Sequence, residues 1–249
     1  MSIDNSRNTP PSISDVRKRL DNVTDPELDE SIVALDYISE IVVQGTTVDV
    51  SFMLPTAWCS PAFAWMMATD ARDEVESLPG VDQASIVLRE HMHETEITEG
   101  VNARRSFGEV FPDADGSVAD IRATLDSKAR LARQYEALNE LLDAGVTAEQ
   151  IVALEYGDLS FDDGVAVTVQ DRSVEIPVSA DPLESYVEKA RATGLIDDDC
   201  DVLFRTPEGE PIEPEQFDLI HKRARLARVN MTGQGGVCDA LNEARWSSN

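Results

Sequence analysis

One stretch, YISEIVVQGTTVDVSFML, most constrains the fold, because it predicts two β-strands joined by a tight turn. We expect strands over residues 38–43 and 48–54, with the turn at residues 44–45. In the second strand, apolar residues alternate with Asp49 and Ser51, which is typical of a sheet with one face in water. A helix is predicted soon after this hairpin, so the segment indicates a mixed domain of helices and strands.

The remaining patterns predict an α+β chain of two domains. Residues 1–11 indicate a disordered tail, and residues 12–111 a small domain in which helices flank a β-sheet. Proline, glycine and acidic residues cluster over residues 111–117, which marks a boundary. Residues 118–249 are expected to form a second, mostly helical domain with a β-hairpin. Its last helix should end near Val229, before a tail that is Gly-rich at first and whose later residues can form a helix.

The net charge of −27 and the pI of about 4.2 constrain the partners of the chain. The acidic residues are spread along the whole sequence, which is typical of halophilic proteins from a high-salt cytoplasm. The charge argues against nucleic-acid binding, which needs a basic face. No apolar run approaches the roughly 20 residues that cross a membrane. The first residues lack the pattern of a signal peptide, so we expect a cytoplasmic protein.

Cys59 is the first candidate for chemistry, because it lies just before a predicted helix start at Ser60 and Pro61. The unpaired N–H groups and the dipole of a helix N-terminus stabilise a thiolate, which is both a nucleophile and a metal ligand. The acidic composition acts in the opposite direction, since nearby negative charge raises the pKa of a thiol. A structural alternative is that Cys59 packs inertly under Trp58 and Phe63.

Asp25 and Glu27 are the second candidates. They flank a proline between the first predicted helix and the first strand. Turn formation is the simpler role there, with the Asp25 carboxylate accepting a hydrogen bond from a nearby backbone N–H.

Histidines and the other cysteines give weaker signals. His91 and His93 end a predicted third strand two residues apart, so both side chains should face one side of it. With a carboxylate or Cys59 they could share a metal, although a solvated strand end is the simpler interpretation. Cys200 and Cys238 have no partner at ligand spacing, so we interpret both as incidental.

Four segments carry a resemblance to a known family. They are, in order, VRKRLDNVTDPEL, SIVALDYISEIVVQGTTVDVSFMLPT, TAWCSP and LPGVDQASIVL. In order and spacing, residues from about 13 to 102 resemble the SufT/PaaD-like family of metal–sulfur cluster assembly factors. The loop cysteine, loop threonine and acidic pair of that family correspond to Cys59, Thr56, Asp25 and Glu27. The chain departs from the Thr-x-x-Cys-Pro loop of the family by the insertion of Ser60.

This resemblance implies a non-catalytic factor that matures iron–sulfur or related metal centres. Cys59 would bind or transfer the cluster, with Thr56, Asp25 and Glu27 in support. The implied partners are client metalloproteins and other cluster-assembly proteins. A cluster normally needs four ligands. An iron–sulfur cluster on Cys59 alone would therefore be held transiently, or would bridge the subunits of a homo-oligomer.

The segment LLDAGVTAEQIVALEYGDLSFDDGVAVTV carries a fainter likeness. Residues from about 127 to 229 resemble the catalytic domain of tyrosine recombinases. The first active-site arginine of that family corresponds to Thr147, and its His-x-x-Arg motif and tyrosine nucleophile do not appear. The likeness implies a degenerate domain kept for interactions. Two other functions stay open: a thiol-dependent oxidoreductase or transferase using Cys59, and a DNA-associated regulator built on the second half.

Overall fold

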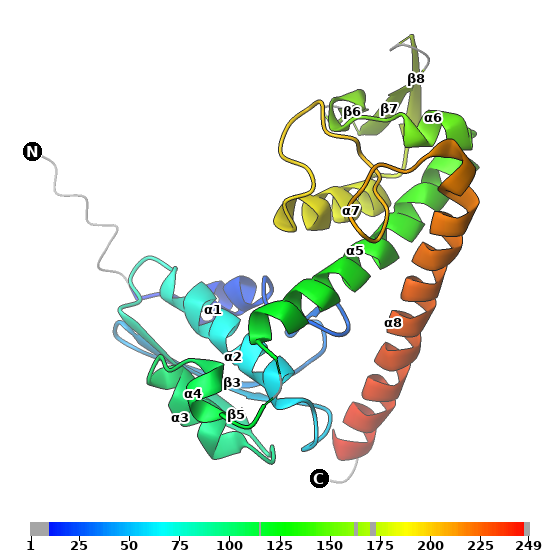
Figure 1. The fold of residues 1–249 in the computed structure, drawn as a ribbon. Coiled ribbons are helices and arrows are strands. Elements are labelled where there is room, and N and C mark those ends of the chain that lie inside the picture. The colour runs from blue at the N-terminus through cyan, green and yellow to red at the C-terminus, as the bar shows by residue number, and fades with distance from the viewer. Residues whose placement is uncertain (1–9, 115, 162–163, 170–172, 247–249) are drawn as a thin grey trace, which may run out of the picture. The chain divides into compact units, whose positions relative to one another are not determined.

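The computed structural model describes residues 10–114, 116–161, 164–169 and 173–246. These residues form two compact units, both of which contain helices and strands (Figure 1). The first unit contains the chain up to Arg122 and the residues from Gln234 onward, and the second is Ala123–Gly233. The predicted α+β fold is confirmed. Residues 1–9 of the predicted tail, and residue 115 of the predicted boundary, lie outside the described residues.

A three-stranded sheet forms the centre of the first unit. Its order is β3–β4–β5, with the strands at Ile38–Gln44, Thr47–Met53 and Gln83–Arg89. β3 and β4 are antiparallel and form the predicted hairpin, whereas β5 runs parallel to β4. A parallel pair needs a crossover connection, and α2 (Pro61–Glu76) provides it. The alternation in β4 is visible as burial, because Val48, Val50 and Phe52 are at most 1% exposed.

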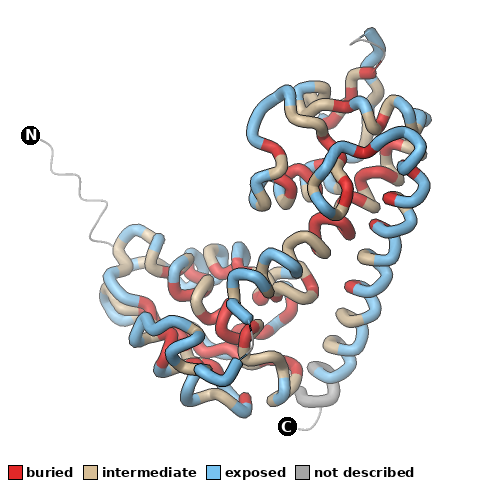
Figure 2. The backbone as a smooth tube through the Cα atoms, viewed as in Figure 1, coloured by how far each residue is buried: buried red, intermediate tan, exposed pale blue. Residues whose placement is uncertain are grey.

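Short elements complete the first unit. They are α1 (Ile13–Leu20), β1 (Thr24–Asp25), β2 (Glu30–Ser31), α3 (Glu94–Asn102) and α4 (Phe107–Val110). β1 and β2 pair as a small antiparallel ladder between α1 and the main sheet in the sequence. Val16 and Leu20 lie four residues apart in α1, so they share one helix face. Both are fully buried in the core of this unit, which appears red in Figure 2.

The second unit combines helices with a second antiparallel sheet, in the order β6–β7–β8. Its elements are α5 (Val118–Asp143, which begins in the first unit), α6 (Ala148–Val152), η2 (Tyr156–Asp158), β6 (Leu159–Ser160), β7 (Val165–Val169), β8 (Val174–Val178), α7 (Ala180–Ala192), η3 (Pro214–Gln216) and α8 (Phe217–Trp246). Thr147, the position matched to a recombinase arginine, is the N-cap of α6. None of the helices in the described part of the chain is long and apolar enough to cross a membrane.

The last helix is longer than predicted. The expected end near Val229 is wrong, because α8 continues without a break through Gly233, Gly235 and Gly236 to Trp246. Each glycine disfavours a helix by about 1 kcal/mol. Tertiary contacts offset part of this cost, because the end of α8 groups with the first unit. Figure 2 shows that much of α8 is exposed. The predicted domains therefore divide the chain at different points from the two units.

Candidate functional site

The loop between β4 and α2 presents Cys59. Its thiol is half-buried and packs against the hydrophobic core of the first unit. The Thr56 Oγ1 atom lies 3.5 Å from Cys59 Sγ, and it also accepts a hydrogen bond of 3.2 Å from the Trp58 backbone N–H. The threonine hydroxyl thus folds the loop back on itself. In this way, the loop brings together the predicted pair Thr56 and Cys59.

Cys59 lies at the start of α2, as predicted. Ser60 occupies the N-cap position and Pro61 follows it at the first helical position, although the Ser60 hydroxyl makes no capping hydrogen bond. The side chain of Trp58 is 75% exposed, so it does not bury the thiol. Phe63 is half-buried and packs on the same core as Cys59. The thiol of Cys59 therefore packs against the core on one side and is not covered by the side chain of Trp58.

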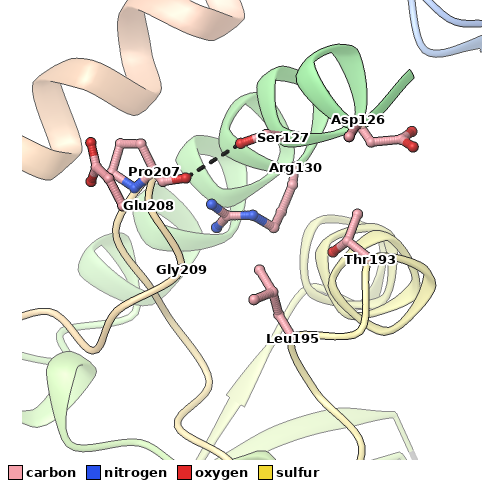
Figure 3. A pocket seen from close by; sticks show the side chains of 9 residues that line it. Asp126, Ser127, Arg130, Thr193, Leu195, Pro207, Glu208 and Gly209 are labelled. Carbon is pink, nitrogen blue, oxygen red and sulfur yellow. Dashed lines mark hydrogen bonds between the residues drawn. The ribbon is translucent and has the colours of Figure 1, made fainter. Parts of the chain in front are cut away.

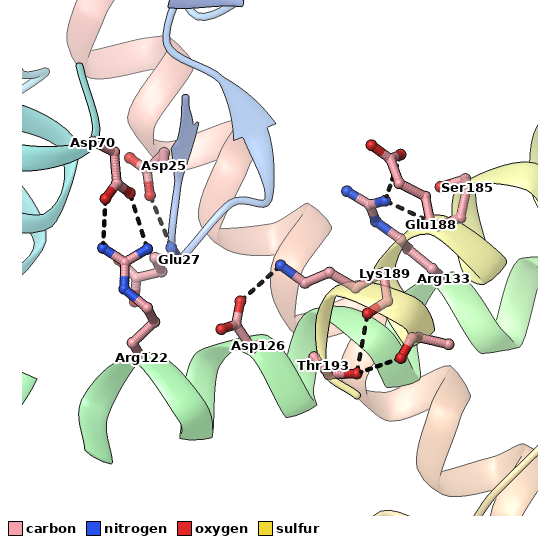
Figure 4. Close-up of polar contacts among 11 residues, drawn as sticks. Asp25, Glu27, Asp70, Arg122, Asp126, Arg133, Ser185, Glu188, Lys189 and Thr193 are labelled. Atoms are coloured by element: carbon pink, nitrogen blue, oxygen red, sulfur yellow. Dashed lines mark hydrogen bonds and ion pairs between the residues drawn. The ribbon is translucent and has the colours of Figure 1, made fainter. Parts of the chain in front are cut away.

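The carboxylate of Asp25 shapes the turn before the sheet. Asp25 is 8% exposed, and its Oδ1 atom accepts a hydrogen bond from the backbone N–H of Glu27 at 2.9 Å (Figure 4). The same atom accepts a hydrogen bond from the backbone N–H of Leu28 at 3.2 Å. This is the turn chemistry that the sequence indicates for Asp25. Burial raises the pKa of Asp25 above its ordinary value, against the lowering effect of these hydrogen bonds. The side chain of Glu27 accepts a 2.8 Å hydrogen bond from Gln234 in α8.

Tyr37 links this turn to the thiols, and sequence reasoning missed it. Tyr37 is 2% exposed, and its hydroxyl donates a 3.3 Å hydrogen bond to Asp25 Oδ2. Burial, then the charge of Asp25, then the thiols of Cys238 and Cys59 all raise the pKa of Tyr37. Both thiols therefore act electrostatically on one buried phenol. No pattern in the sequence connects the tyrosine to Cys238, because the two residues lie far apart in the chain.

The two histidines lie beyond the third strand, which corrects the prediction that they end it on one face. β5 stops at Arg89, and Glu90 adopts a positive φ of 54° that turns the chain out of the strand. His91 Nε2 donates to the Cys59 carbonyl at 2.9 Å, and His91 Nδ1 accepts from the His93 backbone N–H at 3.1 Å. Both ring nitrogens of His91 are thus engaged by backbone, and this side chain braces the Cys59 loop.

His93 takes a different position from His91. It is the N-cap residue of α3, its ring packs edge-on against Phe111 at a centroid distance of 5.2 Å, and its Nδ1 atom lies 3.6 Å from Glu96 Oε1. Among the described residues, no three His, Cys, Asp or Glu side chains converge closely enough to hold a metal ion. A complete metal site within one chain is therefore absent from the described part of the structure.

The second unit contains a cavity that involves none of the predicted site residues. Its volume is about 280 Å³, and Figure 3 shows the Arg130 guanidinium between the loop at Pro207 and the side chain of Leu195. Arg130 is 1% exposed and donates hydrogen bonds to Gln134 Oε1 at 3.0 Å and to the Thr206 carbonyl at 2.9 Å. These bonds tie α5 to the loop that follows residue 205, which is a structural role.

Comparison with known proteins bears on the first unit most directly. Residues 13–86 match the model of a family described as iron-sulfur cluster assembly protein. This range includes Asp25, Glu27, Thr56 and Cys59. A protein of Synechocystis sp. named iron-sulfur cluster carrier protein is 29% identical over 194 residues, which cover 74% of this chain. The chain spans 50% of the length of that relative. No solved structure matches the chain significantly.

The likeness of the second half to tyrosine recombinases is not tested by these matches and stays a prediction. The family model and the carrier protein agree with each other, because both are named for iron–sulfur clusters. The predicted resemblance of the first half of this chain to iron–sulfur cluster assembly factors is confirmed.

Proposed function

We propose that this protein is a non-catalytic factor that holds an iron–sulfur cluster as cargo and passes it to client proteins through Cys59. The supporting observation is the half-buried Cys59 thiol on its loop, within the residues that match a cluster assembly family. Thiolate sulfur is a preferred ligand for iron in such clusters. The named function of the Synechocystis relative, a cluster carrier, supports the same role.

Transfer from Cys59 would be an exchange of ligands. The iron–sulfur bond to Cys59 breaks as a bond to a client cysteine forms, and the proton of the client thiol passes to the Cys59 sulfur. No electron is gained or lost, so no oxidant or reductant is required. The exchange needs a cysteine that a partner can approach, and the exposed Trp58 beside Cys59 leaves the loop accessible.

Two exposed apolar side chains next to Cys59 support docking of a protein partner. Trp58 is 75% exposed and Met92 is 56% exposed. The Met92 backbone N–H donates a 2.9 Å hydrogen bond to the Ala57 carbonyl, which holds the two segments together. Tryptophan and methionine are enriched at protein interfaces. A client or another assembly protein would therefore contact this surface, while its own cysteines approach Cys59.

Other parts of the proposal follow from the same residues. We assign the first unit to the SufT/PaaD-like branch on its Thr56-to-Cys59 loop and its Asp25–Glu27 turn. We place the protein in the cytoplasm, because its three cysteines carry thiols, as expected in a reducing compartment. The acidic composition disfavours the alternative of a DNA-associated regulator. A homo-oligomer would let two copies share one cluster.

The test compares Cys59→Ser with a matched control, Cys200→Ser, in a strain that lacks the native gene. Cys200 is an exposed cysteine of the second unit. We expect Cys59→Ser to leave client iron–sulfur proteins without clusters, and Cys200→Ser to restore them fully. Iron and sulfide in purified client protein provide the measurement. Normal client cluster content with Cys59→Ser would overturn the proposal.

A further inference from the structure

The end of α8 is held against the acidic turn of the first unit. Gln234 Nε2 donates a 2.8 Å hydrogen bond to Glu27 Oε1, across 207 positions of sequence. Glu27 follows Asp25 by two residues, and its backbone N–H is one of the donors to the Asp25 carboxylate. The start of the family-matched segment and the C-terminal half of α8 therefore meet at this turn.

Cys238 lies one helical turn beyond Gln234. Residues four apart in a helix share a face and are separated by about 6 Å along the axis. Cys238 is half-buried and packs against the same buried cluster as Cys59, whereas the adjacent Val237 is 61% exposed. The helix thus turns the cysteine toward the first unit and the valine toward solvent.

Tyr37 is part of the surroundings that the two cysteines share. Its buried ring belongs to the cluster on which both thiols pack. Its phenol responds to the charge of both thiols, which raise the pKa of Tyr37 after burial and Asp25. This influence of both thiols agrees with their packing on the cluster that contains the Tyr37 ring. The Tyr37 hydroxyl also donates a 3.3 Å hydrogen bond to the Asp25 carboxylate.

We propose that Cys238 is a second thiol of the Cys59 site, so that one chain offers two thiolate ligands to an iron–sulfur cluster or to an iron ion on its way into one. This inference rests on the proposed function for the nature of its cargo. The sequence assigns no role to Cys238, because it lies outside the segment that resembles the assembly family.

Two thiolates change what one chain can do with its cargo. A cluster normally takes four protein ligands. Two ligands from one chain leave two ligand positions of the cluster for a donor or a client protein. The cysteines of that protein can then bind the cluster before the thiolates of the carrier dissociate from it. The pair also agrees with the absence of a three-ligand group among the described residues, because the remaining ligands come from the partner.

The first experiment measures proximity without any metal. The full-length reduced protein is treated with dibromobimane, which becomes strongly fluorescent when two nearby thiolates each displace one of its bromides. We expect a fluorescent intramolecular product in the wild type and in Cys200→Ser. The product should be lost in both Cys59→Ser and Cys238→Ser. Absence of the product in the folded wild type would overturn the proposal.

The second experiment measures ligation with Co²⁺ as the probe. Thiolate-to-cobalt charge transfer absorbs in the near ultraviolet, and its intensity rises with the number of thiolates bound. We expect Cys238→Ser to lose about half of this absorbance and to bind Co²⁺ at least tenfold more weakly, which corresponds to about 1.4 kcal/mol. Cys200→Ser should match the wild type. Circular dichroism spectra of all variants check that each remains folded.

The two proposals fail in different ways. If Cys238→Ser matches the wild type in cobalt absorbance and affinity, the second thiol is refuted, while the loss of client clusters in Cys59→Ser still supports the carrier function. If Cys59→Ser supports normal client clusters, the carrier function is refuted, whatever the cobalt titration shows. A bimane product without cobalt–thiolate absorbance would also refute ligation by the pair.

Discussion

The two units use their buried polar groups differently. In the second unit, Arg130 and Tyr186 are at most 1% exposed, and the Tyr186 hydroxyl donates a 2.6 Å hydrogen bond to the Leu203 carbonyl. Burial raises the pKa of Tyr186 to about 12, against the lowering effect of Arg130, so this phenol stays protonated and keeps its bond. In the first unit, the Asp25–Tyr37 pair is also buried, but Tyr37 belongs to the core on which two half-buried thiols pack.

This difference separates groups that hold a fold from groups that shape a site. Two hydrogen bonds of Arg130 end on its own helix and on a nearby loop. Those around Cys59 constrain a loop whose Trp58 is 75% exposed. Ion pairs occur in both units, such as Arg122–Asp70 in the first and Lys189–Asp126 in the second (Figure 4), so charge pairing alone does not mark a site.

The largest expected effect tests whether Arg130 is structural. Arg130→Met keeps the side-chain bulk but leaves the buried Thr206 carbonyl and Gln134 amide without their donor, which should cost about 2–4 kcal/mol of unfolding free energy. Hydrogen exchange measured by mass spectrometry should increase in peptides of the second unit. Arg225→Met, at an exposed position of α8, is the control. If Arg130→Met lost cobalt–thiolate absorbance while keeping its stability, Arg130 would belong to the site and would not be a structural group of the second unit.

The second-largest effect on stability should come from the packing around Gly100 in the first unit. A Cβ atom at Gly100 would lie 2.7 Å from Val110 Cγ2 and 2.8 Å from Trp65 Cη2. We expect Gly100→Ala to destabilise the protein by about 1–3 kcal/mol, because an overpacked core must shift. Gly108→Ala is the matched control, since nothing lies within 4 Å of its added carbon. Urea denaturation provides the measurement. Equal stability of the two variants would contradict the prediction, because it would show that the core around Gly100 accommodates the added carbon without cost.

The Asp25 carboxylate should give a smaller, pH-dependent effect. Its pKa is raised above the ordinary 3.8 by burial, so the folded state holds its proton more tightly than the unfolded state. The contribution of Asp25 to stability therefore falls as the pH rises above about 4, and is constant well below that value. Asp25→Asn cannot titrate, so the stability of the wild type relative to this variant should fall between pH 4 and 7.

Urea denaturation at a series of pH values measures this difference, and Asp36→Asn, at an exposed position, is the control. A relative stability of the wild type that rises over the same range would show that the hydrogen bonds to Asp25 outweigh its burial.

Substitution of Trp58 should have the smallest effect on stability but a clear effect on the rate of cluster transfer. Trp58→Ala should change the unfolding free energy by no more than about 0.5 kcal/mol, because the side chain is largely exposed. It should slow cluster transfer to an apo-ferredoxin, followed by circular dichroism of the acquired cluster. Leu226→Ala, at another exposed apolar residue, should transfer normally. Equal transfer rates would remove Trp58 from the docking surface.

Local patterns in the sequence predicted much of the first unit. The alternation along β4, the turn before it and the Ser-Pro start of α2 depend only on neighbouring residues, and all three appear in the structure. The same patterns placed Cys59 before the helix. They failed for His91 and His93, because the positive φ of Glu90 ends the strand in a way that strand periodicity does not reveal.

The sequence by itself therefore determined the strands, the helix starts and the position of Cys59, because each depends on spacing within a few residues. Only the tertiary structure decided the rest. It extended α8 through three glycines, placed Tyr37 in the core on which Cys59 packs and brought Cys238 to the first unit. These features depend on contacts such as Gln234 to Glu27, 207 positions apart, and no local periodicity carries information over that separation.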